Sequence, residues 1–100
     1  MYTVIVLAPN RDCFARYVHY VAGNKKYRIG KTAGKAKIGI VEYVHITSPE
    51  RMRGIQPKRV VQLRDWQLGF REDDLEDVEI QLQLWKARNS ELFFERPPFL

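Results

Sequence analysis

Residues 25–37 hold the strongest chemical signal of this 100-residue sequence, because six of them are basic and none is acidic. Alternation over 27–31 and a turn at 32–35, after which residues 36–41 can pair back, predict a β-hairpin near 26–41. Lysines and arginines on such a ribbon can contact nucleic-acid phosphates and release counterions. A tyrosine among them can stack on a base. The residues expected to contact nucleic acid are Lys25, Lys26, Tyr27, Arg28, Lys31, Lys35 and Lys37.

Two other interpretations of this segment remain open: a solvated hairpin without a ligand, and a surface for an acidic protein. A nucleotide-binding P-loop is excluded, although Gly30-Lys31-Thr32 imitates its end. That loop needs a glycine five positions earlier so that its amides can cradle phosphates, and Lys25 stands there.

Other reactive residues give weaker patterns. His19 and His45 are the only histidines, and neither has partners at metal-ligand spacing, so no metal site and no cofactor are expected. Asp12 and Asp65 form the one conceivable carboxylate pair for hydrolysis, but helix capping and ion pairing explain both residues more simply. The single cysteine, Cys13, is expected to be a small packing residue in a reducing compartment. We therefore assign no catalytic residues and expect a protein that is not an enzyme.

Three apolar stretches predict the strands that position these residues. Residues 3–8 are apolar without alternation, which favours a strand buried on both faces, as in a parallel sheet. Similar runs lie near 43–47 and 60–64. Helices are predicted near 11–22, from an apolar stripe with Asn10 as its cap, and near 74–88. Over 78–85 the pattern fits a strand as well as a helix, and good helix formers favour the helix.

This pattern predicts a single α/β domain over 1–100, with a small, mainly parallel three-stranded sheet, flanking helices and a protruding basic hairpin. Parallel sheets bind ligands at the carboxyl ends of their strands, where helix N-termini also favour anions. An anion site is therefore predicted there. Its residues are Asn10, Arg11, Ser48 and Arg64.

The net charge of +5 conceals a marked asymmetry. Residues 1–64 carry thirteen Lys and Arg against three acids, whereas residues 65–100 carry four against nine. A polyanion could bind the basic half, or the acidic half could neutralise it within the fold. No signal peptide or bilayer-spanning run is recognisable, so we expect a cytoplasmic protein without a membrane partner.

Two segments resemble parts of P-loop helicases. The strand followed by Ala8-Pro9-Asn10-Arg11 resembles their second strand and turn, where a similar Ala-Pro-Thr-Arg segment touches nucleic acid. Residues 46–54 and 59–65 resemble the approach to their acidic, Mg²⁺-binding strand, although Trp66 stands where a second acid is usual. The resemblance covers about a third of the chain and implies a reduced RecA-like core that lacks the phosphate loop and ATPase activity. Size and pattern also resemble small accessory proteins of bacteriophages.

Two further segments suggest protein partners. Residues 81–85, Gln-Leu-Gln-Leu-Trp, resemble the clamp-binding peptide of bacterial replication proteins, but we expect them to face the core of a helix. The C-terminal tail is too apolar to be free in solvent and is expected to pack on the body or on another subunit. Its apolar residues are Leu92, Phe93, Phe94 and Phe99.

The sequence therefore favours a non-enzymatic, nucleic-acid-binding accessory protein that binds DNA or RNA through its basic hairpin. The alternative is a protein-interaction module, either a homodimer or an inhibitor of a host protein, that uses the C-terminal tail. A degenerate nucleotide-binding enzyme is the third hypothesis.

Overall fold

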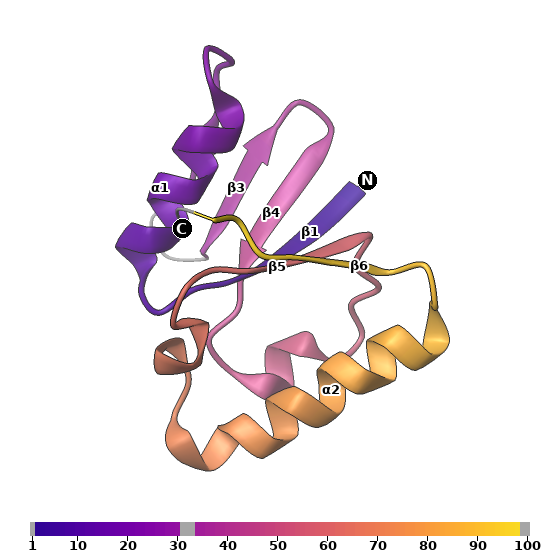
Figure 1. The fold of residues 1–100 in the computed structure, drawn as a ribbon. Helices are drawn as coiled ribbons and strands as arrows, with labels where there is room; N and C mark the ends of the chain where they lie inside the picture. Colours follow the sequence, from indigo (N-terminus) through magenta and orange to yellow (C-terminus); the bar gives the residue numbers. More distant parts are fainter. Residues whose placement is uncertain (1, 31–33, 99–100) are drawn as a thin grey trace.

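In the computed structural model, which describes residues 2–30 and 34–98, the chain folds into one mixed sheet with helices on both faces (Figure 1). The strands are β1 (Tyr2–Leu7), β2 (Arg28–Ile29), β3 (Lys35–Ile38), β4 (Val41–His45), β5 (Arg59–Gln62) and β6 (Phe93–Glu95). The α-helices are α1 (Arg11–Ala22) and α2 (Leu75–Arg88). Short 3-10 helices are η1 (Pro49–Met52), η2 (Trp66–Gly69) and η3 (Glu72–Asp74).

The strand order over the described residues is β2-β3-β4-β1-β5-β6. The neighbours from β4 to β6 run parallel, whereas β2, β3 and β4 pair antiparallel. The α/β class is confirmed, and the three predicted strands form the parallel centre β4-β1-β5. The prediction of only three strands in this sheet is wrong, because the basic hairpin and the C-terminal tail each extend it.

The hairpin is part of the sheet and does not protrude from it. β3 pairs with β4 from Lys35 opposite Val44 to Ile38 opposite Val41, after a turn at Gly39, whose φ is 61°. The physical reason is the burial of Ala36 and Ile38, which would be exposed to water on a free ribbon.

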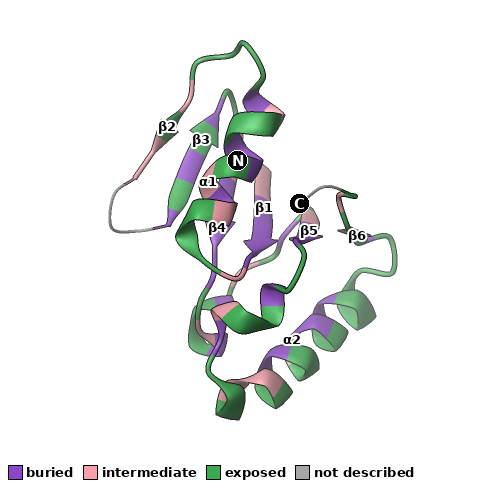
Figure 2. Cartoon of the chain, turned by 60° about the vertical axis from the view of Figure 1, so that its left-hand side comes forward, coloured by how far each residue is buried: buried purple, intermediate pink, exposed green. Residues whose placement is uncertain are grey.

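The two faces of the sheet carry separate hydrophobic cores, and β1 contributes to both. Val4 and Val6 point toward α1, while Ile5 and Leu7 point toward α2, and none of the four is exposed. This explains why the strand is apolar without alternation. Figure 2 shows β1 pink at its start and purple over the rest of its length.

Helix α1 begins and ends at the predicted residues. The Asn10 side chain accepts a hydrogen bond from the Cys13 amide at 2.9 Å, which satisfies one of the free amides of the first turn. Gly23 ends the helix with a φ of 57°, and its amide donates to the His19 carbonyl. Phe14, Tyr17 and Val18 of the predicted stripe are buried.

Helix α2 settles the ambiguity over 78–85 in favour of a helix. Val78, Leu82 and Trp85 form its buried stripe. Because Leu82 and Trp85 lie in the core, residues 81–85 do not form an accessible, extended clamp-binding peptide in this structure.

The C-terminal tail packs on the body of the protein, as one of the two predictions for it states. It forms β6, which pairs in parallel with β5, and Leu92 is buried while Phe94 packs against the α2-side core. An ion pair between Arg59 and Glu95 joins β5 to β6. Phe99 lies outside the described residues. No helix within 2–30 or 34–98 has the length and apolarity that crossing a membrane requires.

Candidate nucleic-acid interface

The basic residues of the hairpin share one face of the sheet. Strand pairing places Arg28 opposite Lys37, and Lys35 lies two residues before Lys37 on β3. Because side chains alternate across a strand, all three point away from α1. They are exposed, since α2 covers only the other end of this face (Figure 2).

The opposite face of the hairpin is apolar and anchors it. Ile29, Ala36 and Ile38 pack against the α1-side core. The hairpin is therefore amphipathic, and packing on one face fixes the backbone that presents the cations on the other.

Tyr27 lies on the apolar face of the hairpin, the one that packs toward α1. Its ring packs against the α1-side core, and its hydroxyl lies 3.0 Å from Nδ1 of His19, with the two rings edge to face. Lys25 and Lys26 precede it in an exposed connection. A wide, shallow cavity of about 530 Å³ lies between Lys26, Tyr27, Arg28 and Lys37. Base stacking on Tyr27 stays a prediction, and Lys31 lies outside the described residues.

The acidic half of the chain does not neutralise these cations by direct pairing. Over residues 2–30 and 34–98, the one ion pair is that between Arg59 and Glu95. Three acids at the start of α2 are exposed: Glu76, Asp77 and Glu79. They belong to the element that lies at the other end of the sheet from β2 and β3 (Figure 2). The exposed acids of α2 therefore lie away from the hairpin cations, whereas Glu42 of β4 lies opposite Lys37 in the strand pairing.

The predicted anion site is divided between two cavities at the carboxyl edge of the parallel strands. The first, of about 240 Å³, lies at the ends of β1 and β4 and includes Asn10 and Arg11. The second, of about 210 Å³, lies beside β5 and β6 and includes Arg64. Ser48 lines neither cavity and makes no side-chain capping bond. The four predicted residues are therefore not gathered in one of these two cavities, and anion binding by them stays a prediction.

The strand order explains this division. β1 lies between β4 and β5, so the residues that follow β4 and β5 cannot adjoin one another directly. After Arg64 the chain turns at Asp65, whose φ of 56° is rare for a residue other than glycine, and enters η2.

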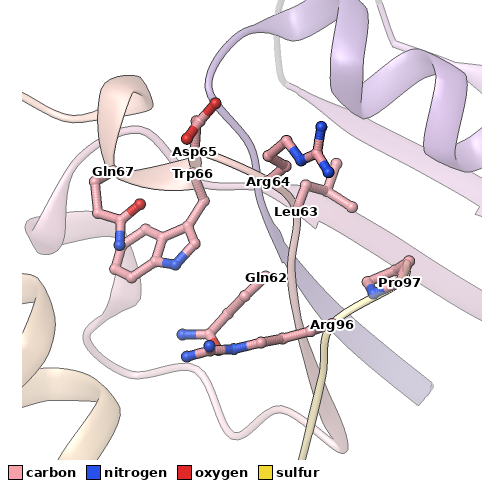
Figure 3. A pocket seen from close by; sticks show the side chains of 8 residues that line it. All are labelled: Gln62, Leu63, Arg64, Asp65, Trp66, Gln67, Arg96 and Pro97. Atoms are coloured by element: carbon pink, nitrogen blue, oxygen red, sulfur yellow. The ribbon is translucent and has the colours of Figure 1, made fainter. Parts of the chain in front are cut away.

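The second cavity is lined by three charged residues, two glutamines, Leu63, Trp66 and Pro97; the charged ones are Arg64, Asp65 and Arg96. Figure 3 shows Gln62 and Arg96 side by side below the indole of Trp66, and Nε of Arg96 donates to the Gln62 amide oxygen at 3.2 Å. The Asp65 carboxylate points away from them (Figure 3). Asp12 lines neither of these cavities, so the structure does not gather the conceivable carboxylate pair in one of them.

The first cavity contains residues that were not predicted to act together. Besides Asn10 and Arg11, it is lined by His45, Thr47 and Arg51. One feature of the sequence could have indicated this grouping: Arg11 follows the end of β1, and Arg51 the end of β4, within six residues. From the sequence alone, the one conceivable role of His45 is as a metal ligand together with His19, and no metal site is expected. The structure gives the two histidines different partners, and no cluster of three metal-binding side chains occurs within the described ranges.

Comparison with known proteins gives a likeness in fold. No protein-family model matches the sequence, and no curated protein sequence matches it. Among solved structures, a mutant of the large terminase ATPase domain of Thermus phage P74-26 is similar, with a TM-score of 0.55 and 11% sequence identity. The alignment covers 95% of this chain and 47% of that one. The likeness is one of fold alone. The chain spans about half the length of the ATPase domain it resembles.

Proposed function

We propose that this protein is a non-enzymatic accessory protein that binds nucleic acid through the exposed face of its β2–β3 hairpin. The observation that carries the proposal is the placement of Arg28, Lys35 and Lys37 on one exposed face whose reverse side is anchored in the core. A hairpin fixed in this way loses little conformational entropy on binding, unlike a mobile basic loop. Lys25, Lys26 and Lys31 extend the proposed contact.

The similar fold of a phage ATPase domain gives limited support to an accessory role in a bacteriophage. In this chain Pro9-Asn10-Arg11 follows β1, without the glycines that a phosphate loop requires. This supports binding without ATP hydrolysis.

The proposal predicts a steep salt dependence that the hairpin cations control. For duplex DNA, each phosphate contact contributes about −0.9 to the slope of log K against log salt concentration. The variant R28A/K35A/K37A should therefore flatten the slope by about 2.7 and bind far more weakly at low salt. Fluorescence anisotropy with labelled DNA and RNA at several salt concentrations measures both quantities.

A matched variant separates specific contacts from net charge. R53A/R71A/R88A removes three exposed cations at other positions and changes the net charge equally. We expect its slope of log K against log salt concentration to differ from the wild-type slope by no more than about 0.9, the contribution of one phosphate contact. Equal losses in the two variants, or no binding by the wild type at low salt, would refute the proposal.

The second candidate function, a protein-interaction module, is favoured by one observation. Phe93 is 59% exposed on β6, which forms one edge of the sheet. Leu92 is buried and Phe94 packs against the α2-side core, so a partner that binds the tail would contact mainly Phe93. Sedimentation equilibrium tests its homodimer form: a monomeric mass at high protein concentration, unchanged by F93A, would exclude self-association through this edge.

A further inference from the structure

The cavity at the ends of β1 and β4 combines groups that attract anions. Arg11 and Arg51 reach it from two different elements, α1 and η1. α1 also begins there, and only the Cys13 amide of its first turn is capped by Asn10. The remaining free amides and the helix dipole favour negative charge at this place. No acidic residue is among the residues that line the cavity.

His45 supplies an independent indication of a ligand. It lines the cavity, yet it is only 6% exposed, and its Nε2 atom is buried without a hydrogen-bond partner among the described residues. Buried polar atoms are nearly always paired, so an unpaired one in a native protein calls for an explanation. The ring is held in place by stacking on Phe14, with centroids 5.2 Å apart and an interplanar angle of 18°.

We infer that this cavity is a binding site for a tetrahedral oxyanion of the phosphate type. Nε2 of His45 would donate to one of its oxygens, and Arg11 and Arg51 would neutralise its charge. Thr47 adds a hydroxyl donor. The volume of about 240 Å³ far exceeds the ~30 Å³ share of one water molecule, so the anion fits with part of its hydration shell. The cavity borders Gly34, just before β3, but none of Arg28, Lys35 and Lys37 lines it, so the site does not depend on the function proposed for the hairpin.

The surroundings of His45 give the site a pH dependence. Burial lowers the pKa of His45, the nearby Ala8 backbone raises it, and the positive charge of Arg11 lowers it again. The charged groups that line its cavity are Arg11 and Arg51. In the empty site the lowered pKa keeps the imidazole neutral at pH 7, and a bound anion favours the protonated ring. Anion binding should therefore take up a proton and strengthen as the pH falls toward 5.

Sulfate is the appropriate first probe, because its charge does not change between pH 5 and 8. In a titration followed by ¹H–¹⁵N NMR, with chloride at equal ionic strength as reference, we expect saturable shifts of the Arg11 and Asp12 amides and of the His45 ring. Affinity should rise severalfold from pH 8 to pH 5. Loss of one charge-assisted hydrogen bond should weaken binding about tenfold in R51A. R53A, which removes an exposed arginine that does not line the cavity, should bind sulfate like the wild type.

The variant H45F tests the role of the ring nitrogen while keeping an aromatic partner for Phe14. We expect it to lose the pH dependence but to keep part of the affinity through the two arginines. Three further probes then identify the natural ligand. Inorganic phosphate represents a free ion, and a 5′-phosphorylated oligonucleotide represents a phosphate monoester. The same oligonucleotide without its 5′-phosphate represents the backbone diester alone. Sulfate shifts that do not saturate, or wild-type affinity in R51A and H45F, would overturn the inference.

Discussion

Replacing Trp85 with alanine is expected to destabilise the protein by about 3–5 kcal/mol. Its side chain is only 1% exposed and belongs to the buried stripe through which α2 packs on the sheet. Alanine would leave a large cavity between α2 and the sheet, which the surrounding core could fill only in part. A domain of this size has a total stability of about 5–15 kcal/mol, so much of it would be lost.

Leu84, which neighbours Trp85 on the same helix, provides the control. It is 43% exposed, and L84A should change the free energy of unfolding by about 0.5 kcal/mol or less. Urea unfolding followed by circular dichroism compares the two variants, provided that the m-value is unchanged. Similar midpoints for W85A and L84A would contradict the packing of α2 described above.

The second large effect is expected at Gly69, in η2. A β-carbon at this position would lie 2.1 Å from the carbonyl oxygen of Ala8 and 3.2 Å from its carbonyl carbon. Both are backbone atoms at the buried end of β1, so they cannot turn aside as a flexible side chain would. We expect G69A to cost about 1–3 kcal/mol or more. It should also weaken sulfate binding, because Ala8 leads directly to Pro9 and Asn10 at the anion cavity.

Replacing Gly54 with alanine is the control, because it shows how much any glycine-to-alanine change lowers the stability without a steric clash. Gly54 has a φ of 79° and open space around the position of a β-carbon, so G54A should pay only a backbone cost of about 1 kcal/mol. Thermal unfolding measures both variants, since 1 kcal/mol corresponds to about 4–8 °C for a domain of this size. A melting temperature of G69A equal to that of the wild type would show that Gly69 and Ala8 do not approach so closely.

Local sequence patterns predicted the elements with strong periodicity or continuous burial. The run over 3–8 indicated a strand buried on both faces, and β1 contacts both cores. The stripe from Phe14 to Val21, with Asn10 before it, predicted α1 at its observed bounds. In these cases the side chains that determine the structure are close together in the sequence.

The parts that were missed depend on contacts between distant segments. β6 has three residues and becomes a strand only because β5, some thirty residues earlier, offers its edge. The hairpin was predicted, but its place beside β4 depends on burying Ala36 and Ile38 beneath α1. Neither pairing leaves a periodic signal in its own segment.

The candidate sites show the same difference between features set by local sequence and features set by contacts between distant segments. A basic hairpin could be predicted from composition, and alternation places its cations on one face. Anion binding at this edge of the sheet stays a prediction, and the residues that line each cavity there depend on strand order, which the sequence did not specify. His45 and Arg51 join Arg11 because β4 is next to β1, while Arg64 belongs to the cavity beyond β5.

The most direct test of nucleic-acid binding through the hairpin is a ¹H–¹⁵N NMR map of the protein with a short oligonucleotide at low salt. We predict that the largest shifts fall on residues 25–30 and 35–38, and that they disappear as salt is raised. Residues of α2 should not shift, since that helix carries the exposed acids. Shifts centred on α2 or β6, or no saturable shifts, would contradict the proposal.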